Sequence, residues 1–130
     1  MEFVLEQLRI CWGWALEEGL TTWLEVFDKR WSHCHQWSGC PTWILSRNVL
    51  GLHPRFDLGA NHYVLNLEPG GLDSAEGVIP VPYSNDTLSV SWKRMPEGIS
   101  YTLKTSSPIW LHVPGEDKPV QVDAEYQSLC

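Results

Sequence analysis

A change of hydrophobic spacing near Pro54 constrains the fold of this chain more than any other feature. Before it, residues 3–17 place apolar side chains at steps of three and four, which predicts an amphipathic helix. After it, short β-rich runs are separated by turn signals, and in residues 87–92 every second side chain is large and apolar. That alternation is typical of a strand with one buried face. We therefore expect an α+β chain with its helices first and its sheets second.

The first part predicts two helices joined by a long irregular loop. The helix over 3–17 should end at Gly19, because glycine readily takes the left-handed conformation that stops a helix. A second helix is expected over 39–50 with Ser38 as its N-cap, after an irregular segment over 20–37. Such a helical hairpin cannot bury both apolar faces alone. The residues predicted to be buried are Val4, Leu5, Leu8, Cys11, Trp12, Ala15 and Leu16 in the first helix and Trp43, Ile44, Val49 and Leu50 in the second.

The second part predicts a small antiparallel β-sandwich. Pro80 and Pro82 place the run over 77–83 at a sheet edge, since proline cannot donate to a ladder, and Asn85 with Asp86 suits a hairpin turn. The boundary should fall within 52–59, which divides the chain into a helical part, 1–54, and a sandwich, 55–130. The predicted strands cover residues 62–67, 77–83, 87–94, 99–105 and 109–114.

Charge and composition exclude several classes of partner. Sixteen acidic and nine basic residues give a formal net charge of -7, which disfavours nucleic acid and offers no basic patch for an anionic membrane. No apolar run reaches the roughly 18 residues of a membrane span. Glu2 and Glu6 stand where a secretory signal would carry positive charge, so a cytoplasmic location is favoured.

The four cysteines do not indicate a metal centre. They form no CxxC pair, and Cys34 with His35 and Cys40 lacks the two tight ligand pairs of structural zinc sites. Free, mostly buried thiols are the better interpretation of Cys11, Cys34, Cys40 and Cys130. No metal and no cofactor are expected.

The stretch 19–39 combines aromatic rings with a carboxylate and two histidines. Glu25 lies between Trp23 and Phe27, and a carboxylate flanked by aromatics is partly desolvated, which makes it a better base near neutral pH. The rings of Trp31 and Trp37 could stack on a sugar. From spacing alone, the better-supported alternative is structural, with Glu25 bonded to a neighbouring loop and the tryptophans in the core.

Several motifs in this order add a more specific hypothesis. GLTTWLEVFD, SHCHQWSGCP and VLGLHP, followed by AEGVIPVPY and LSVSW, closely resemble the C-terminal end of bacterial α-L-rhamnosidases, inverting glycoside hydrolases similar to family 78. The resemblance covers residues 12–105. It implies that the helices are the last hairpin of an (α/α)6 six-hairpin barrel and that a C-terminal β-sandwich follows.

The resemblance also implies roles for individual residues. Glu25 matches the general base, His35 a histidine of the sugar pocket and Trp37 an aromatic of the same wall, with Trp23 as a further sugar-binding residue. The expected reaction is inverting hydrolysis of terminal α-L-rhamnosides, with a rhamnose-containing glycan or glycoside as the partner. The family's general acid lies on an earlier part of the barrel, and Glu17 and Glu18 do not match it.

The chain is therefore expected to be a C-terminal fragment that is inactive alone. Two alternatives stay open. In the first, the chain is a carbohydrate-binding module that holds glycan without cleaving it. In the second, it is a subunit that completes a barrel whose N-terminal portion another chain supplies.

Overall fold

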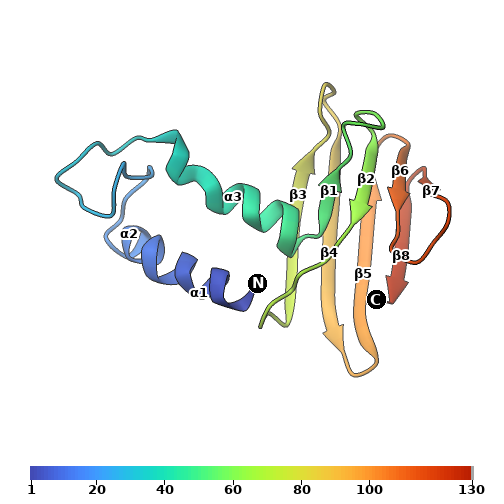
Figure 1. Cartoon of the computed structure of the whole chain (residues 1–130), viewed down its shortest axis with the longest axis horizontal. Coiled ribbons are helices and arrows are strands. Elements are labelled where there is room, and N and C mark those ends of the chain that lie inside the picture. Colours follow the sequence, from blue (N-terminus) through green and yellow to red (C-terminus); the bar gives the residue numbers. More distant parts are fainter. Residues whose placement is uncertain (130) are drawn as a thin grey trace.

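The computed structural model describes residues 1–129, and its helices come first in the chain, as predicted (Figure 1). Helix α1 spans Glu2–Cys11 and α2 spans Gly13–Glu17, so the single helix predicted over 3–17 is wrong in one respect. It is interrupted at Trp12, next to Gly13, because glycine is a weak helix former. The predicted stop is confirmed, since Gly19 has a φ of +74°.

The second helical segment begins earlier than predicted. A 3-10 turn, η1 (Gln36–Gly39), leads into α3 (Cys40–Ile44) and then into a π-helical turn, η2 (Leu45–Val49). The predicted N-cap, Ser38, instead lies inside η1, where its hydroxyl donates to the Leu24 carbonyl at 2.5 Å. The helix ends before Gly51, whose φ of +77° lies in the left-handed region that stops a helix.

Two four-stranded sheets form the rest of the molecule. One has the order β1-β2-β6-β7 and the other β3-β4-β5-β8; β2 and β6 pair in parallel and the remaining pairs are antiparallel. The strands are β1 (Leu52–Pro54), β2 (His62–Leu65), β3 (Ser74–Pro80), β4 (Thr87–Met95), β5 (Gly98–Thr105), β6 (Ile109–His112), β7 (Val120–Val122) and β8 (Glu125–Leu129).

All five predicted strands are present, with shifted bounds, and three were missed. The missed strands are β1 and β7, with three residues each, and β8, with five. The edge position predicted from Pro80 is confirmed, because β3 ends its sheet. The turn predicted at Asn85 and Asp86 lies between β3 and β4, but it is longer than a two-residue hairpin, since Pro80 pairs with Thr87.

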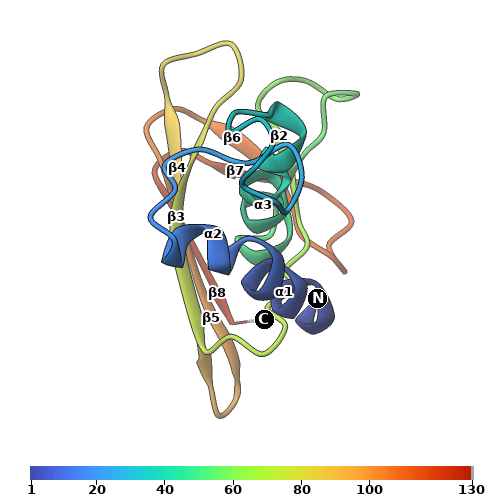
Figure 2. The same ribbon diagram turned by 90° about the vertical axis from the view of Figure 1, so that its left-hand side faces the viewer.

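The core lies between the inner faces of the two sheets, an arrangement compatible with a small β-sandwich. Figure 2 shows them as separate layers, with β3 and β4 on one side and β2 and β6 on the other. The alternation predicted over 87–92 is confirmed, because its apolar side chains are buried and its polar ones exposed. Leu5, Val49 and Leu50 from the helices belong to the same buried cluster as the strands. The division at residue 54 stays a prediction.

Side chains of the β3-β4-β5-β8 sheet hold the C-terminal end of the second helix. The last carbonyls of a helix have no partner within it. The Trp92 indole N–H donates to the Val49 carbonyl at 2.7 Å, and the Tyr101 hydroxyl donates to the Leu50 carbonyl at 3.0 Å. These two buried bonds fix the point where the helix meets the sandwich.

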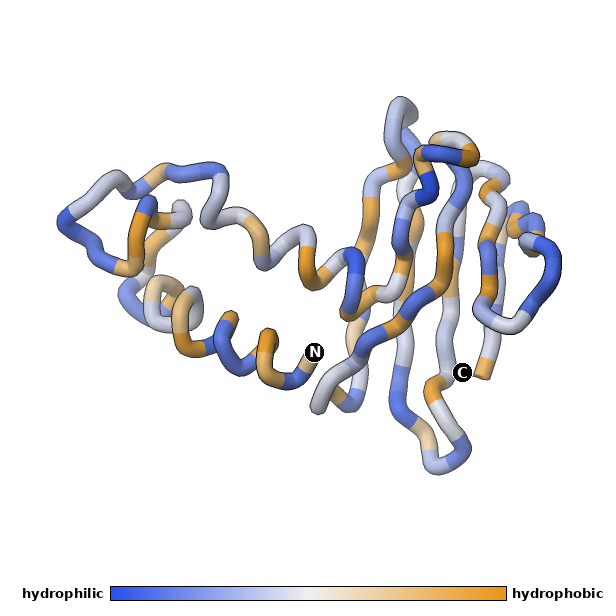
Figure 3. The backbone as a smooth tube through the Cα atoms, in the orientation of Figure 1, coloured by the Kyte–Doolittle hydropathy of each residue, from blue (hydrophilic) through white to orange (hydrophobic). Residues whose placement is uncertain are grey.

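Several large apolar side chains of the helices remain exposed. Trp43 is 61% exposed and Leu16 is 60% exposed, so their predicted burial is wrong: neither the hairpin nor the sandwich covers those faces. Figure 3 shows hydrophobic segments recurring along both helices. No helix within 1–129 is long and apolar enough to span a bilayer. The large apolar side chains more than half exposed on the helices and their loop are Phe3, Ile10, Leu16, Phe27, Trp31, Trp37 and Trp43.

Candidate functional site

The loop between α2 and η1 doubles back on itself. The Glu25 N–H donates to the Ser32 carbonyl at 2.8 Å, and the His35 N–H donates to the Trp23 carbonyl at 3.0 Å. The Thr22 hydroxyl also donates to the His33 carbonyl. These bonds lay the two limbs of the loop side by side, which brings Glu25 next to His35.

Three of the four predicted site residues meet at this point: Glu25, His35 and Trp37. The Glu25 Oε2 lies 3.9 Å from the His35 Nδ1, beyond hydrogen-bond distance, with side chains 30% and 25% exposed. The His35 ring lies 4.2 Å from the Trp37 ring at 35° between their planes. The Trp37 indole N–H donates to the Glu25 carbonyl at 3.0 Å. A half-exposed carboxylate thus lies beside an imidazole and an exposed aromatic face.

Trp23 faces a different surface. Its side chain lines an apolar groove of about 420 Å³ between the α1–α2 segment and α3. It also lines a small cavity with Trp12 and Phe27, whose rings meet edge to face at 4.9 Å. Trp23 therefore contributes its backbone carbonyl to the group of Glu25, His35 and Trp37, because that carbonyl accepts from the His35 N–H.

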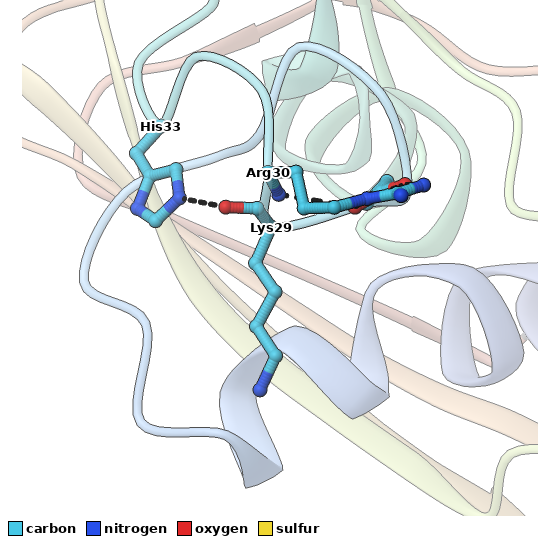
Figure 4. A network of polar contacts seen from close by, with 4 residues as sticks. Lys29, Arg30 and His33 are labelled. Carbon is cyan, nitrogen blue, oxygen red and sulfur yellow. Dashed lines mark hydrogen bonds and ion pairs between the residues drawn. The ribbon is translucent and has the colours of Figure 1, made fainter.

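The charged side chains of the loop pair with one another. Asp28 forms an ion pair with Arg30, whose side-chain and backbone hydrogen bonds hold the pKa of that carboxyl below its usual value. Glu18 pairs with Lys29. The His33 Nε2 lies 2.6 Å from the Lys29 carbonyl oxygen, and Figure 4 shows the ring directed at that oxygen. Among the loop's carboxylates, Glu25 is the one that faces an imidazole.

A second polar group, on the outer face of the β1-β2-β6-β7 sheet, was missed by the sequence analysis. His62 Nδ1 lies 3.2 Å from His112 Nε2, and the His62 ring stacks on Trp110 at 6.1 Å. His53 lies on the same sheet with its Nε2 buried and unpartnered within residues 1–129. Burial, then the charge of Arg47, lowers the pKa of His53. A signal was present in the sequence, because His62 and His112 occupy positions of β2 and β6 that alternate with the buried ones.

The thiols are more exposed than predicted. Cys34 and Cys40 are exposed and Cys11 is half-buried; all three are free, and Cys130 lies outside the described residues. The expectation of mostly buried thiols is therefore wrong, because Cys34 lies on the exposed loop and Cys40 at the exposed start of α3. Over the described part of the chain, no group of three or more His, Cys, Asp or Glu side chains is placed to hold a metal ion.

Comparison with known proteins assigns no family: no family model matches the chain, and no curated protein matches it.

Proposed function

We propose that this chain carries the base-bearing end of an inverting α-L-rhamnosidase-like glycoside hydrolase. The observation that carries the proposal is the meeting of Glu25 and His35, from the loop, with Trp37 of η1. A sugar needs hydrogen-bonding groups for its hydroxyls and an aromatic face for its C–H surface, and the loop offers both. The order of the sequence motifs supplies the substrate class.

In this proposal Glu25 is the general base. Its carboxylate takes a proton from water as the water attacks the anomeric carbon, while His35 bonds a sugar hydroxyl and Trp37 stacks on the ring. An inverting enzyme also needs a carboxylic acid roughly 6.5–9.5 Å from the base, to protonate the leaving oxygen. The neighbouring carboxylates Glu18 and Asp28 are held by Lys29 and Arg30. As the resemblance implies, we assign the acid to an earlier part of the barrel.

The exposed helix faces support this assignment. Phe3, Ile10, Leu16 and Trp43 are each 58% exposed or more, an unusual amount of apolar surface for helices packed in a finished core. In an (α/α)6 barrel, the faces of one hairpin are covered by its neighbours. The same faces would serve a subunit that completes a barrel in trans.

A titration with L-rhamnose tests the binding part of the proposal. We expect calorimetry to detect binding to the purified chain that is lost in Trp37→Ala. The matched control is Trp43→Ala, because Trp43 is 61% exposed against 60% for Trp37 yet lies on α3, with Arg47 over its ring. Equal loss in both variants, or no binding by the unmodified chain, contradicts the assignment of Trp37.

A hydrolysis assay separates the enzyme from the binding module. The chain alone should not release nitrophenol from 4-nitrophenyl α-L-rhamnoside. Mixed with a rhamnosidase barrel that lacks its last hairpin, it should restore turnover that Glu25→Gln abolishes. Rhamnose binding without restored turnover favours the carbohydrate-binding module, and turnover by the chain alone contradicts the missing acid.

A further inference from the structure

Strand pairing places two histidines together on the outer face of the β1-β2-β6-β7 sheet. β2 and β6 run in parallel, with His62 opposite Trp110 and Val64 opposite His112. Residues two apart on a strand point to the same face, so His62 and His112 lie diagonally across the strand pair. This surface lies at the other end of the molecule from the loop that holds Glu25, so it is independent of the proposed glycosidase site (Figure 1).

The contact between the two rings is a nitrogen-to-nitrogen contact. His62 Nδ1 and His112 Nε2 are 3.2 Å apart, so one ring donates its N–H and the other accepts it. The pair is half-buried, and the His62 ring lies 6.1 Å from the Trp110 ring with 18° between their planes. Gly59 lies under the His62 ring, where an added Cβ would approach to 3.2 Å. The two nitrogens are thus held close by rigid strands.

This separation is also that of two nitrogens bound to one metal ion. Imidazole nitrogens bind zinc at about 2.0–2.1 Å, so two of them at bond angles between 90° and 109° lie roughly 2.9–3.4 Å apart. We propose that His62 and His112 form a two-histidine site for a divalent transition-metal ion, with Cu²⁺ preferred to Zn²⁺. Nitrogen ligands and the usual order of divalent affinities both favour copper.

Binding requires a rearrangement of one proton. Both contacting nitrogens must present lone pairs to the ion, so the donating ring moves its proton to its other nitrogen and turns about its Cβ–Cγ bond. No net proton is released when both rings start neutral. Asp57, on the loop before β2, is paired with Arg55. Because no group of three ligands exists within 1–129, water fills the remaining positions and leaves them open to an added ligand.

A copper titration tests the site. The thiols are first alkylated, because Cys34 and Cys40 are exposed and would bind or reduce Cu²⁺. We expect one Cu²⁺ per chain, with an electron paramagnetic resonance spectrum of two imidazole nitrogens. Affinity should fall at least tenfold in His62→Ala and in His112→Ala.

Two other histidines provide matched controls. His33→Ala removes an exposed histidine of the helical loop, and His53→Ala removes one on the same sheet; neither should weaken copper binding. If His112→Ala fails to fold, His62→Gln serves instead, because glutamine can still bond to His112 but is a poor copper ligand. Unchanged binding in either His62 or His112 variant, a spectrum with one nitrogen, or no saturable binding overturns the proposal.

Discussion

Two buried tyrosines offer a matched test of how hydrogen bonding stabilises this fold. Tyr63 on β2 is 1% exposed and Tyr101 on β5 is 0% exposed, so each ring is fully packed. The Tyr101 hydroxyl donates to the Leu50 carbonyl at 3.0 Å, whereas the Tyr63 hydroxyl has no partner within residues 1–129. Replacing each by phenylalanine removes one oxygen and keeps the ring.

The two substitutions should therefore have opposite signs. Tyr101→Phe leaves the carbonyl of Leu50, itself 7% exposed, buried without its donor, which costs about 1–3 kcal/mol of unfolding free energy. Tyr63→Phe removes an unpaired hydroxyl from an apolar site and should gain about 1 kcal/mol. The variants should thus differ by about 2–4 kcal/mol. For 130 residues, each kcal/mol shifts the melting temperature by roughly 4 °C.

Urea denaturation followed by far-ultraviolet circular dichroism measures both free energies of unfolding. The slope with urea should stay constant, because neither change alters the surface exposed on unfolding. The reasoning is refuted if Tyr63→Phe loses as much stability as Tyr101→Phe, since the cost would then come from ring packing and not from the bonded hydroxyl.

Two further predictions concern a histidine and a pair of glycines. Burial, with help from the charge of Arg47, lowers the pKa of His53 from its ordinary 6.5, so the unfolded chain binds its proton first. The contribution of neutral His53 to the free energy of unfolding is complete above about pH 6.5 and is lost as the pH falls from there through the lower pKa of His53 in the folded chain. His53→Gln should flatten that decline when the free energy of unfolding is measured by urea titration at several pH values. Gly77→Ala should cost about 1–3 kcal/mol, because the new Cβ would lie 2.6 Å from the Leu50 Cδ1. Gly13→Ala, with no atom within 4 Å, should gain up to about 1 kcal/mol, and thermal unfolding of both variants provides the comparison.

Local patterns carried most of what could be predicted. The alternation over 87–92 specifies β4 because it depends on neighbouring residues alone, and Gly19 and Gly51 stop helices through their own backbone preference. The strands β1 and β7 could not be predicted in this way, since three residues are too few to show an alternating pattern. Their pairing depends on residues that are distant in the chain.

The site residues show the same limit. Spacing identified Glu25 and His35 as polar groups among aromatics, but their approach depends on the fold of the loop, through bonds such as that from Glu25 to Ser32. His62 and His112 are 50 positions apart in the chain, and a parallel strand pair brings them together. No local pattern encodes such a meeting.

The two bonds from the sheet fix one end of the second helix, so a tilt of the helix about that end moves its other end. Its base is clamped where Trp92 and Tyr101 hold the last carbonyls, and its far end carries the loop with Glu25. The arm, residues 36–49, is about 20 Å long, so a tilt of about 10° at the base would displace the loop by roughly 3 Å. Trp92 and Tyr101, buried in the sandwich, thus determine the position of the Glu25 carboxylate without contacting it.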